Sequence, residues 1–110
     1  MPRAVKDARL ESRTARAQLK PSGQPYYRSI DAGLHLGYRR GKKAGRWVMR
    51  RYVGDERYVV ETIGVADDLS DADGVKVLSY RQAQARLREF AGERNRLDGE
   101  DPTIVSQLVV

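Results

Sequence analysis

Length, composition and charge already exclude several classes of protein. The chain has 110 residues, enough for one small domain with a single core. It has no cysteine and one histidine, so disulfides, thiolate metal sites and multi-imidazole sites are excluded. No apolar run approaches the roughly 20 residues that cross a bilayer, and the start lacks a hydrophobic signal-peptide core. We therefore expect a cytoplasmic protein without a cofactor.

The net charge of +6 comes from one stretch of the sequence. Of 21 Lys and Arg and 15 Asp and Glu, residues 38–58 hold eight basic and two acidic ones, which leaves thirteen of each elsewhere. A basic surface on an otherwise balanced scaffold indicates a partner that carries many phosphates.

The first third of the chain predicts little regular structure. Residues 1–11 alternate charges with few large apolar residues, so we expect them to be mobile. Residues 12–19 predict a short helix with Ser12 as its N-cap, stopped by Pro21. Residues 25–30 are extended by composition and predict either an edge strand or tyrosines packed over one end of a sheet.

The central stretch predicts a three-stranded antiparallel meander. Its strands are residues 34–40, 46–53 and 57–63, and the second of them is rich in aromatic and β-branched residues. The connections between them contain glycine, as tight reversals require. We expect the third strand to carry a β-bulge, because its apolar residues do not alternate cleanly, and we place Glu61 opposite Arg50.

Alternation assigns the two faces of this meander. Pairing Tyr38 with Trp47 sorts the side chains of the first two strands into an apolar and a basic set. The apolar face holds Leu34, Leu36, Tyr38, Trp47 and Met49, and the face open to solvent or a ligand holds His35, Arg39, Arg46, Arg50 and Tyr52.

After the meander we expect an acidic loop and one long helix. Residues 65–77 lack the ligand spacing of a calcium loop, so we interpret them as a solvated loop. Ser79 and Gln82 form a capping box that opens a helix ending near Leu97. Its apolar stripe is Tyr80, Ala83, Leu87, Phe90, Ala91 and Leu97, with Arg86, Glu89, Glu93 and Arg96 outside. The predicted fold is thus α+β: a three-stranded antiparallel sheet packed on one C-terminal helix, followed by a linker over residues 98–110.

The basic face suggests how the protein meets its partner. Three strands span roughly 10 Å, and a B-DNA major groove is about 12 Å wide, so a sheet of this size fits the groove. An arginine fork on a strand can read guanine, whereas loop lysines suit phosphates. We predict that Arg39, Arg46, Arg50 and Tyr52 read bases and that Arg40, Lys42 and Lys43 hold the DNA backbone.

Two alternatives from other classes remain open. A double-stranded RNA-binding module could use the same basic sheet, though it would read shape and 2′-hydroxyls. A protein-interaction module could instead receive a partner strand at the sheet edge. We find no constellation of residues that supports an enzyme in this chain.

The residues also resemble a known family. The segments GLHLGYRRGKKAGRWVMRRY and YVVETIGVADDLSDADGVKVLSYRQAQARL are similar to the amino-terminal arm-binding domain of phage-type integrases, the tyrosine recombinases, over residues 12–90. The resemblance implies a three-stranded sheet in the major groove of arm-type DNA sites, contacted by Arg39, Arg40, Arg46, Arg50 and Arg51.

The resemblance further implies a division of labour. Cutting belongs in that family to a separate catalytic domain, so residues 12–97 would bind DNA only, and residues 98–110 would lead into a core-binding domain. Double-stranded DNA, other integrase protomers and accessory DNA-bending proteins are the implied partners. The chain is either an excised domain or a natural short protein.

Overall fold

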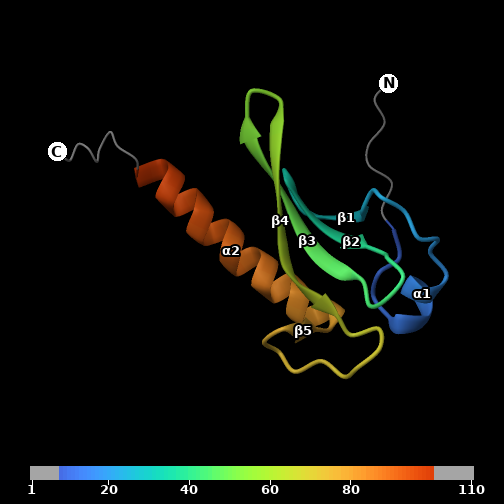
Figure 1. The fold of residues 1–110 in the computed structure, drawn as a ribbon. Helices are drawn as coiled ribbons and strands as arrows, with labels where there is room; N and C mark the ends of the chain where they lie inside the picture. The colour runs from blue at the N-terminus through green and yellow to red at the C-terminus, as the bar shows by residue number, and fades with distance from the viewer. Residues whose placement is uncertain (1–7, 101–110) are drawn as a thin grey trace.

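Five strands form one curled sheet that a long C-terminal helix crosses (Figure 1). The computed structural model describes residues 8–100. The strands follow the order β1-β2-β3-β4-β5, antiparallel except for the parallel pair β4–β5. The elements are α1 (Arg13–Ala17), β1 (Tyr26–Asp31), β2 (Leu34–Arg39), β3 (Arg46–Gly54), β4 (Arg57–Ala66), β5 (Val77–Leu78) and α2 (Tyr80–Glu100).

The predicted α+β class is confirmed, but the sheet has five strands where three were expected. The extended segment before the meander becomes β1, with Tyr26 opposite Tyr38 on β2. At the other edge, Val77 and Leu78 leave the acidic loop and pair with Val65 and Ala66. The edge-strand alternative for residues 25–30 is thus confirmed, whereas β5 was not predicted, because a two-residue strand depends on a neighbour already in place.

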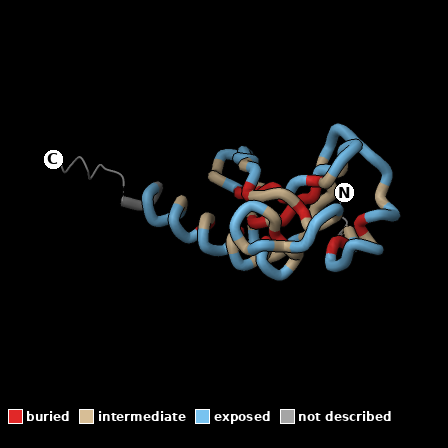
Figure 2. The backbone as a smooth tube through the Cα atoms, turned by 60° about the horizontal axis from the view of Figure 1, so that its bottom comes forward, coloured by how far each residue is buried: buried red, intermediate tan, exposed pale blue. Residues whose placement is uncertain are grey.

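The predicted pairing of β2 with β3 is confirmed, since Tyr38 lies opposite Trp47. Trp47 and Met49 are fully buried, and Ala83 and Leu87 of α2 are fully buried in the same cluster. The indole N–H of Trp47 donates to the Leu78 carbonyl at 2.8 Å, so its one polar atom is satisfied inside the core. Buried positions gather between the strands and the first turns of α2 (Figure 2).

Both helix starts follow the predicted capping chemistry. The Ser12 hydroxyl accepts from the Ala15 amide at 3.0 Å. The Ser79 hydroxyl accepts from the Gln82 amide at 3.2 Å, and the Gln82 side chain accepts from the Ser79 amide at 3.0 Å. This reciprocal pair is a capping box, as expected.

The end of α2 differs from the prediction. The helix continues to Glu100 instead of ending near Leu97, because Asp98 and Gly99 only weaken a helix whereas Pro102 is the first residue that cannot extend one. Leu97 is 56% exposed, since this end projects past the sheet (Figure 2). No helix in residues 8–100 has the length and apolarity needed to span a membrane.

The start of the described chain is anchored to the sheet. Leu10 is fully buried, and the Ala8 amide donates to the Tyr27 carbonyl at 3.0 Å. The expected mobility of residues 1–11 therefore does not hold for residues 8–11. The rest of that segment, and the end of the expected linker after Glu100, lie outside the described residues.

A bulge interrupts the pairing of β3 with β4, as the poor alternation predicted. Trp47 lies opposite Gly64 and Val48 opposite Thr62, so Ile63 is the extra residue. Ile63 is 5% exposed and joins the core. The bulge thus turns one more apolar side chain towards α2.

The predicted partner of Glu61 is wrong. Arg50 lies opposite Val60, and Glu61 lies opposite Met49 on the face that α2 covers. There its carboxylate accepts from both arms of the Arg94 guanidinium, at 3.0 and 3.2 Å. Glu61 therefore lies on the side of the sheet that faces α2 and not on the side of Arg50.

The turn between β3 and β4 is strained, and we expect a glycine to relieve it. Asp55 and Glu56 have φ of 54° and 60°, a left-handed conformation that costs residues with a Cβ about 1 kcal/mol each. Glu56→Gly should raise the free energy of unfolding by about 0.5–1 kcal/mol, seen as a melting temperature higher by about 2–5 °C.

Glu56→Ala is the matched control for this turn. It removes the carboxylate but keeps the Cβ, so we expect no comparable gain. A lower melting temperature for Glu56→Gly than for the original chain would contradict the strain argument.

Candidate nucleic-acid interface

The strand register defines one face of the sheet that α2 leaves open. Side chains alternate between the two faces along each strand, and directly paired residues lie on the same face. Arg39, Arg46 and the residues of β1–β4 that alternate or pair with them therefore lie on this face, opposite the core. We call it the basic face. Its side chains are Tyr27, Ser29, His35, Arg39, Arg46, Val48, Arg50, Tyr52, Tyr58, Val60, Thr62 and Val65.

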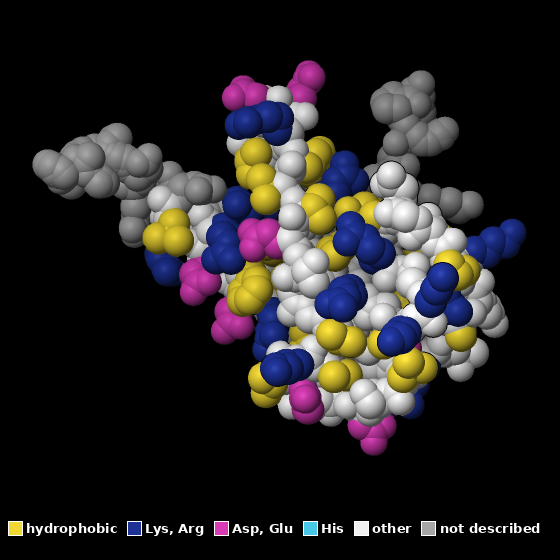
Figure 3. Space-filling view, in the orientation of Figure 1, with side chains coloured by type: hydrophobic (Ala, Val, Ile, Leu, Met, Phe, Trp, Pro, Cys, Tyr) yellow, Lys and Arg dark blue, Asp and Glu magenta, His cyan; other side chains and the backbone are white. Residues whose placement is uncertain are grey.

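Two arginines oppose each other directly on the basic face. Arg39 of β2 pairs with Arg46 of β3, both are exposed, and neither forms an ion pair within residues 8–100. The strand carboxylates are engaged on the helix side, where Asp31 meets Arg88 at 3.8 Å and Glu61 meets Arg94. Like charges directly across two strands repel, so this face favours an anionic ligand. Lys and Arg side chains are spread over the strands in Figure 3.

Arg50 is held between two tyrosines at the centre of the basic face. Its guanidinium carbon lies 4.0 Å from the Tyr58 ring centroid and 5.2 Å from that of Tyr27. A Cβ at Gly37 would come within 2.6 Å of the Tyr27 ring, so glycine lets this ring lie across β2. The His35 ring stands edge-on to both tyrosines. Stacking orients the planar fork and leaves its edge able to bind a base or phosphate.

Tyr52 lies on the basic face as predicted, nearer the turn. It is 44% exposed and stands edge-on to Tyr58 with ring centroids 5.2 Å apart. Its hydroxyl accepts from the Glu56 amide at 3.1 Å. Tyr52 therefore combines a turn-stabilising role with an accessible ring.

The basic residues of the β2–β3 loop lie beside α1. Lys42 and Lys43 are exposed, whereas Arg40 is half-buried and donates to the Arg16 carbonyl at 2.8 Å. Together with Arg13 they line a hollow of about 360 Å³. Of the three predicted backbone-binding residues, two lysines are thus fully accessible and Arg40 is partly committed to the fold.

Arg51 does not share the basic face. It is 8% exposed on the side of α2, where its Nη1 donates to the Asn95 side-chain oxygen at 3.1 Å. It lines a cavity of about 550 Å³ between α2 and the β1–β2 turn. Neighbours on a strand point to opposite faces, so Arg50 and Arg51 cannot both meet one ligand. We therefore remove Arg51 from the predicted DNA-binding set.

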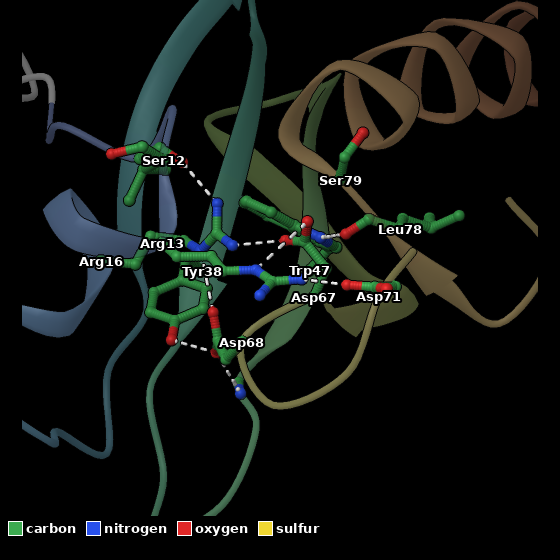
Figure 4. Close-up of polar contacts among 12 residues, drawn as sticks. Ser12, Arg13, Arg16, Tyr38, Trp47, Asp67, Asp68, Asp71, Leu78 and Ser79 are labelled. Carbon is green, nitrogen blue, oxygen red and sulfur yellow. Dashed lines mark hydrogen bonds and ion pairs between the residues drawn. The ribbon is translucent and has the colours of Figure 1, made fainter. Parts of the chain in front are cut away.

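A buried arginine that the sequence did not single out supports this interface (Figure 4). Arg16 of α1 is 1% exposed, and its guanidinium binds Asp67 and, at 3.0 Å, Asp68. It also donates to the Leu10 carbonyl at 3.0 Å and lies 5.1 Å from the Trp47 ring centroid. The acidic loop, predicted to be merely solvated, thus supplies the counter-charges of a buried cation.

Asp68 connects this cluster to the basic end of the sheet. Its second oxygen accepts from the Tyr38 hydroxyl and from the Gly45 amide at 2.8 Å. Burial raises the pKa of Asp68, but the bonds from Tyr38, Gly45 and Arg16 outweigh it and hold that pKa below the usual value. Since Gly45 immediately precedes Arg46, the ionised carboxylate fixes the end of the β2–β3 loop.

The rest of the acidic loop is organised by its own backbone. One oxygen of Asp73 accepts from the amides of Val75, Lys76 and Val77 at 2.8–3.0 Å. Among the residues that the structure describes, no group of three or more His, Asp or Glu side chains could hold a metal ion.

The sequence did not predict the roles of Tyr27, Tyr58 and Arg16. The pairing of residues on either side of the β3–β4 turn would have predicted that Tyr58 lies opposite Tyr52. For Arg16 no local signal existed, because its carboxylate partners lie 51 and 52 residues away. Comparison with protein-family models, with curated proteins and with solved structures finds no match to this chain.

Proposed function

We propose that this chain binds double-stranded DNA in a sequence-dependent way, with its basic face in the major groove, and that it serves site-specific recombination or DNA integration. The observation that carries the DNA-binding part is the opposed pair Arg39 and Arg46 beside the stacked Arg50, on a face without strand carboxylates. The recombination part is supported only by the resemblance of residues 12–90 to integrase arm-binding domains. Strand cutting would belong to a separate catalytic domain.

The geometry favours insertion of part of the sheet. Four neighbouring strands span roughly 14 Å, which exceeds a groove about 12 Å wide, whereas three span roughly 10 Å. The arginines lie on β2 and β3, so these strands with β4 would enter the groove and β1 would stay at its rim. Lys42 and Lys43, in the loop at one end, would then reach the phosphates.

The first test is binding to short duplexes over a series of salt concentrations. We expect the logarithm of the affinity to fall steeply with the logarithm of salt, with a slope of about −0.9 per phosphate neutralised. Arg39→Ala and Arg46→Ala should each weaken binding by about 5- to 150-fold where the arginine reads a base, and Lys42→Ala should lower the slope by about 1.

Arg96→Ala is the matched control, because this exposed arginine lies on α2 and outside the basic face. It should change affinity little. Competition with duplex RNA separates the RNA-binding alternative, which predicts stronger competition than by duplex DNA. Binding that is insensitive to salt, or absent at low salt, would contradict the proposal.

A further inference from the structure

The outer edge of β4 is uncovered over residues 57–62 in the part of the chain that the structure describes. Residue 8 bonds to the outer edge of β1, and β5 covers β4 at Val65 and Ala66. No strand of residues 8–100 pairs with the outer edge of β4 over residues 57–62. Tyr58, Val59 and Val60 are 42%, 38% and 47% exposed there. This edge carries no proline or lysine, the residues that usually protect an edge from pairing.

The hydrogen-bond phase of β4 shows which backbone groups point outward. The Tyr52 amide donates to the Gly33 carbonyl at 2.8 Å, away from β4, so Tyr52 and Tyr58 form a pair without mutual hydrogen bonds. The phase repeats every second residue along an antiparallel ladder. Tyr58, Val60 and Thr62 therefore direct their N–H and C=O groups towards the open edge.

The same stretch is complementary to itself when a second copy runs antiparallel. If Val59 faces its own counterpart, Tyr58 of each copy faces Val60 of the other, and both of these residues have outward backbone groups. Arg57 then lies directly opposite Glu61, an opposite-charge pair on the face of α2. Aromatic–β-branched and opposite-charge pairs are both favourable across strands. Glu61 can accept from Arg94 and Arg57 together, since a carboxylate has about four acceptor positions.

We propose that two copies of this chain associate through residues 57–61 of β4, paired antiparallel about Val59, to form one continuous sheet. Side chains of directly paired residues point to the same side, so both basic faces would lie on one side of the joined sheet. The inference uses only the edge of β4 and does not depend on DNA binding.

A cysteine scan tests the pairing directly, because the chain has no cysteine of its own. In the proposed dimer Val59 and its counterpart in the second copy form a pair without mutual hydrogen bonds. The two Cα atoms of such a pair are about 4.5 Å apart, within the range of a disulfide. Val59→Cys should therefore form a disulfide-linked dimer under mild oxidation. Thr62→Cys is the matched control on the same strand, since Thr62 would face Glu56 of the other copy, and it should crosslink at least about tenfold more slowly.

Sedimentation of the original chain at up to about 1 mM should show a species of twice the 12.4 kDa monomer mass. Arg57→Glu places like charges opposite each other and should shift the chain to monomer, whereas Arg57→Lys should not. Arg57 is exposed, so neither change should affect folding. Val60→Pro removes an outward N–H and should also give monomer.

A monomer at 1 mM would overturn the proposal. So would a dimer that Arg57→Glu and Val60→Pro leave intact, or one that crosslinks through Thr62→Cys and not Val59→Cys. If the original chain forms the dimer but does not bind duplex DNA, the result counts against the proposed function and leaves the proposed dimer intact.

Discussion

Arg16→Ala is expected to lower the free energy of unfolding by about 3–5 kcal/mol, the usual cost of removing one partner of a buried ion pair. The guanidinium is 1% exposed and neutralises Asp67 and Asp68, which would be left partly buried without their cation. Urea denaturation followed by circular dichroism measures the loss. Because small domains are stable by only about 5–15 kcal/mol, this single change removes a large share of the total.

Two variants show whether the position or merely the charge matters. Arg13→Ala removes a half-exposed arginine from the same helix. Its nearer partner, Asp71, is almost fully exposed, and the Nε of Arg13 lies 3.9 Å from Asp67, so we expect a smaller loss of at most about 1 kcal/mol. Arg16→Lys keeps the charge but lacks the fork that reaches two carboxylates, so we expect an intermediate loss. A loss below about 1 kcal/mol for Arg16→Ala would contradict a supporting role for this cluster.

Arg50→Lys is expected to reduce preference for the best-bound duplex over a scrambled duplex by about 5- to 150-fold, while binding to the scrambled duplex changes little. Lysine keeps the charge that attracts phosphates but has no planar fork to read guanine. Measuring both affinities at one salt concentration separates the two effects. This expectation rests on the proposed DNA binding and on the stacking of Arg50 against Tyr58.

Tyr58 provides a second test of the same arrangement. Tyr58→Phe keeps the ring under Arg50 and should retain the preference, whereas Tyr58→Leu removes the ring and should lose part of it. Arg96→Ala again serves as the control on α2. Equal weakening on both duplexes for Arg50→Lys would show that Arg50 contributes only charge.

At Arg51 the resemblance and the alternation pattern disagree, and the structure follows alternation. A strand that exposes Arg50 and Tyr52 turns Arg51 inward, and Arg51 is indeed buried beside Asn95. The resemblance had placed Arg51 with the DNA-contacting residues. Successive side chains of any strand point to opposite faces. The position of Arg51 on its strand is therefore better evidence for its orientation than a role inferred from similarity.

The sequence by itself determined the local features of this fold. The N-cap of α1, the capping box of α2, the turns and the pairing of Tyr38 with Trp47 are local features. They depend on residues within a few positions of each other or joined by one short loop. The bulge near Ile63 was also visible as a break in alternation. These features follow from backbone geometry and side-chain periodicity, which a short window of sequence contains.

Only the tertiary structure decided which distant residues meet. The ion pairs of Arg16 with Asp67 and Asp68, the contact of Glu61 with Arg94, and the stacking of Arg50 on Tyr27 of β1 all join segments far apart in the chain. Charge counts cannot tell a neutralised arginine from one that faces solvent. That distinction depends on chain packing in three dimensions, which buries Arg16 and Arg51. It leaves Arg39 and Arg46, which alternation had already placed on one face, exposed to solvent.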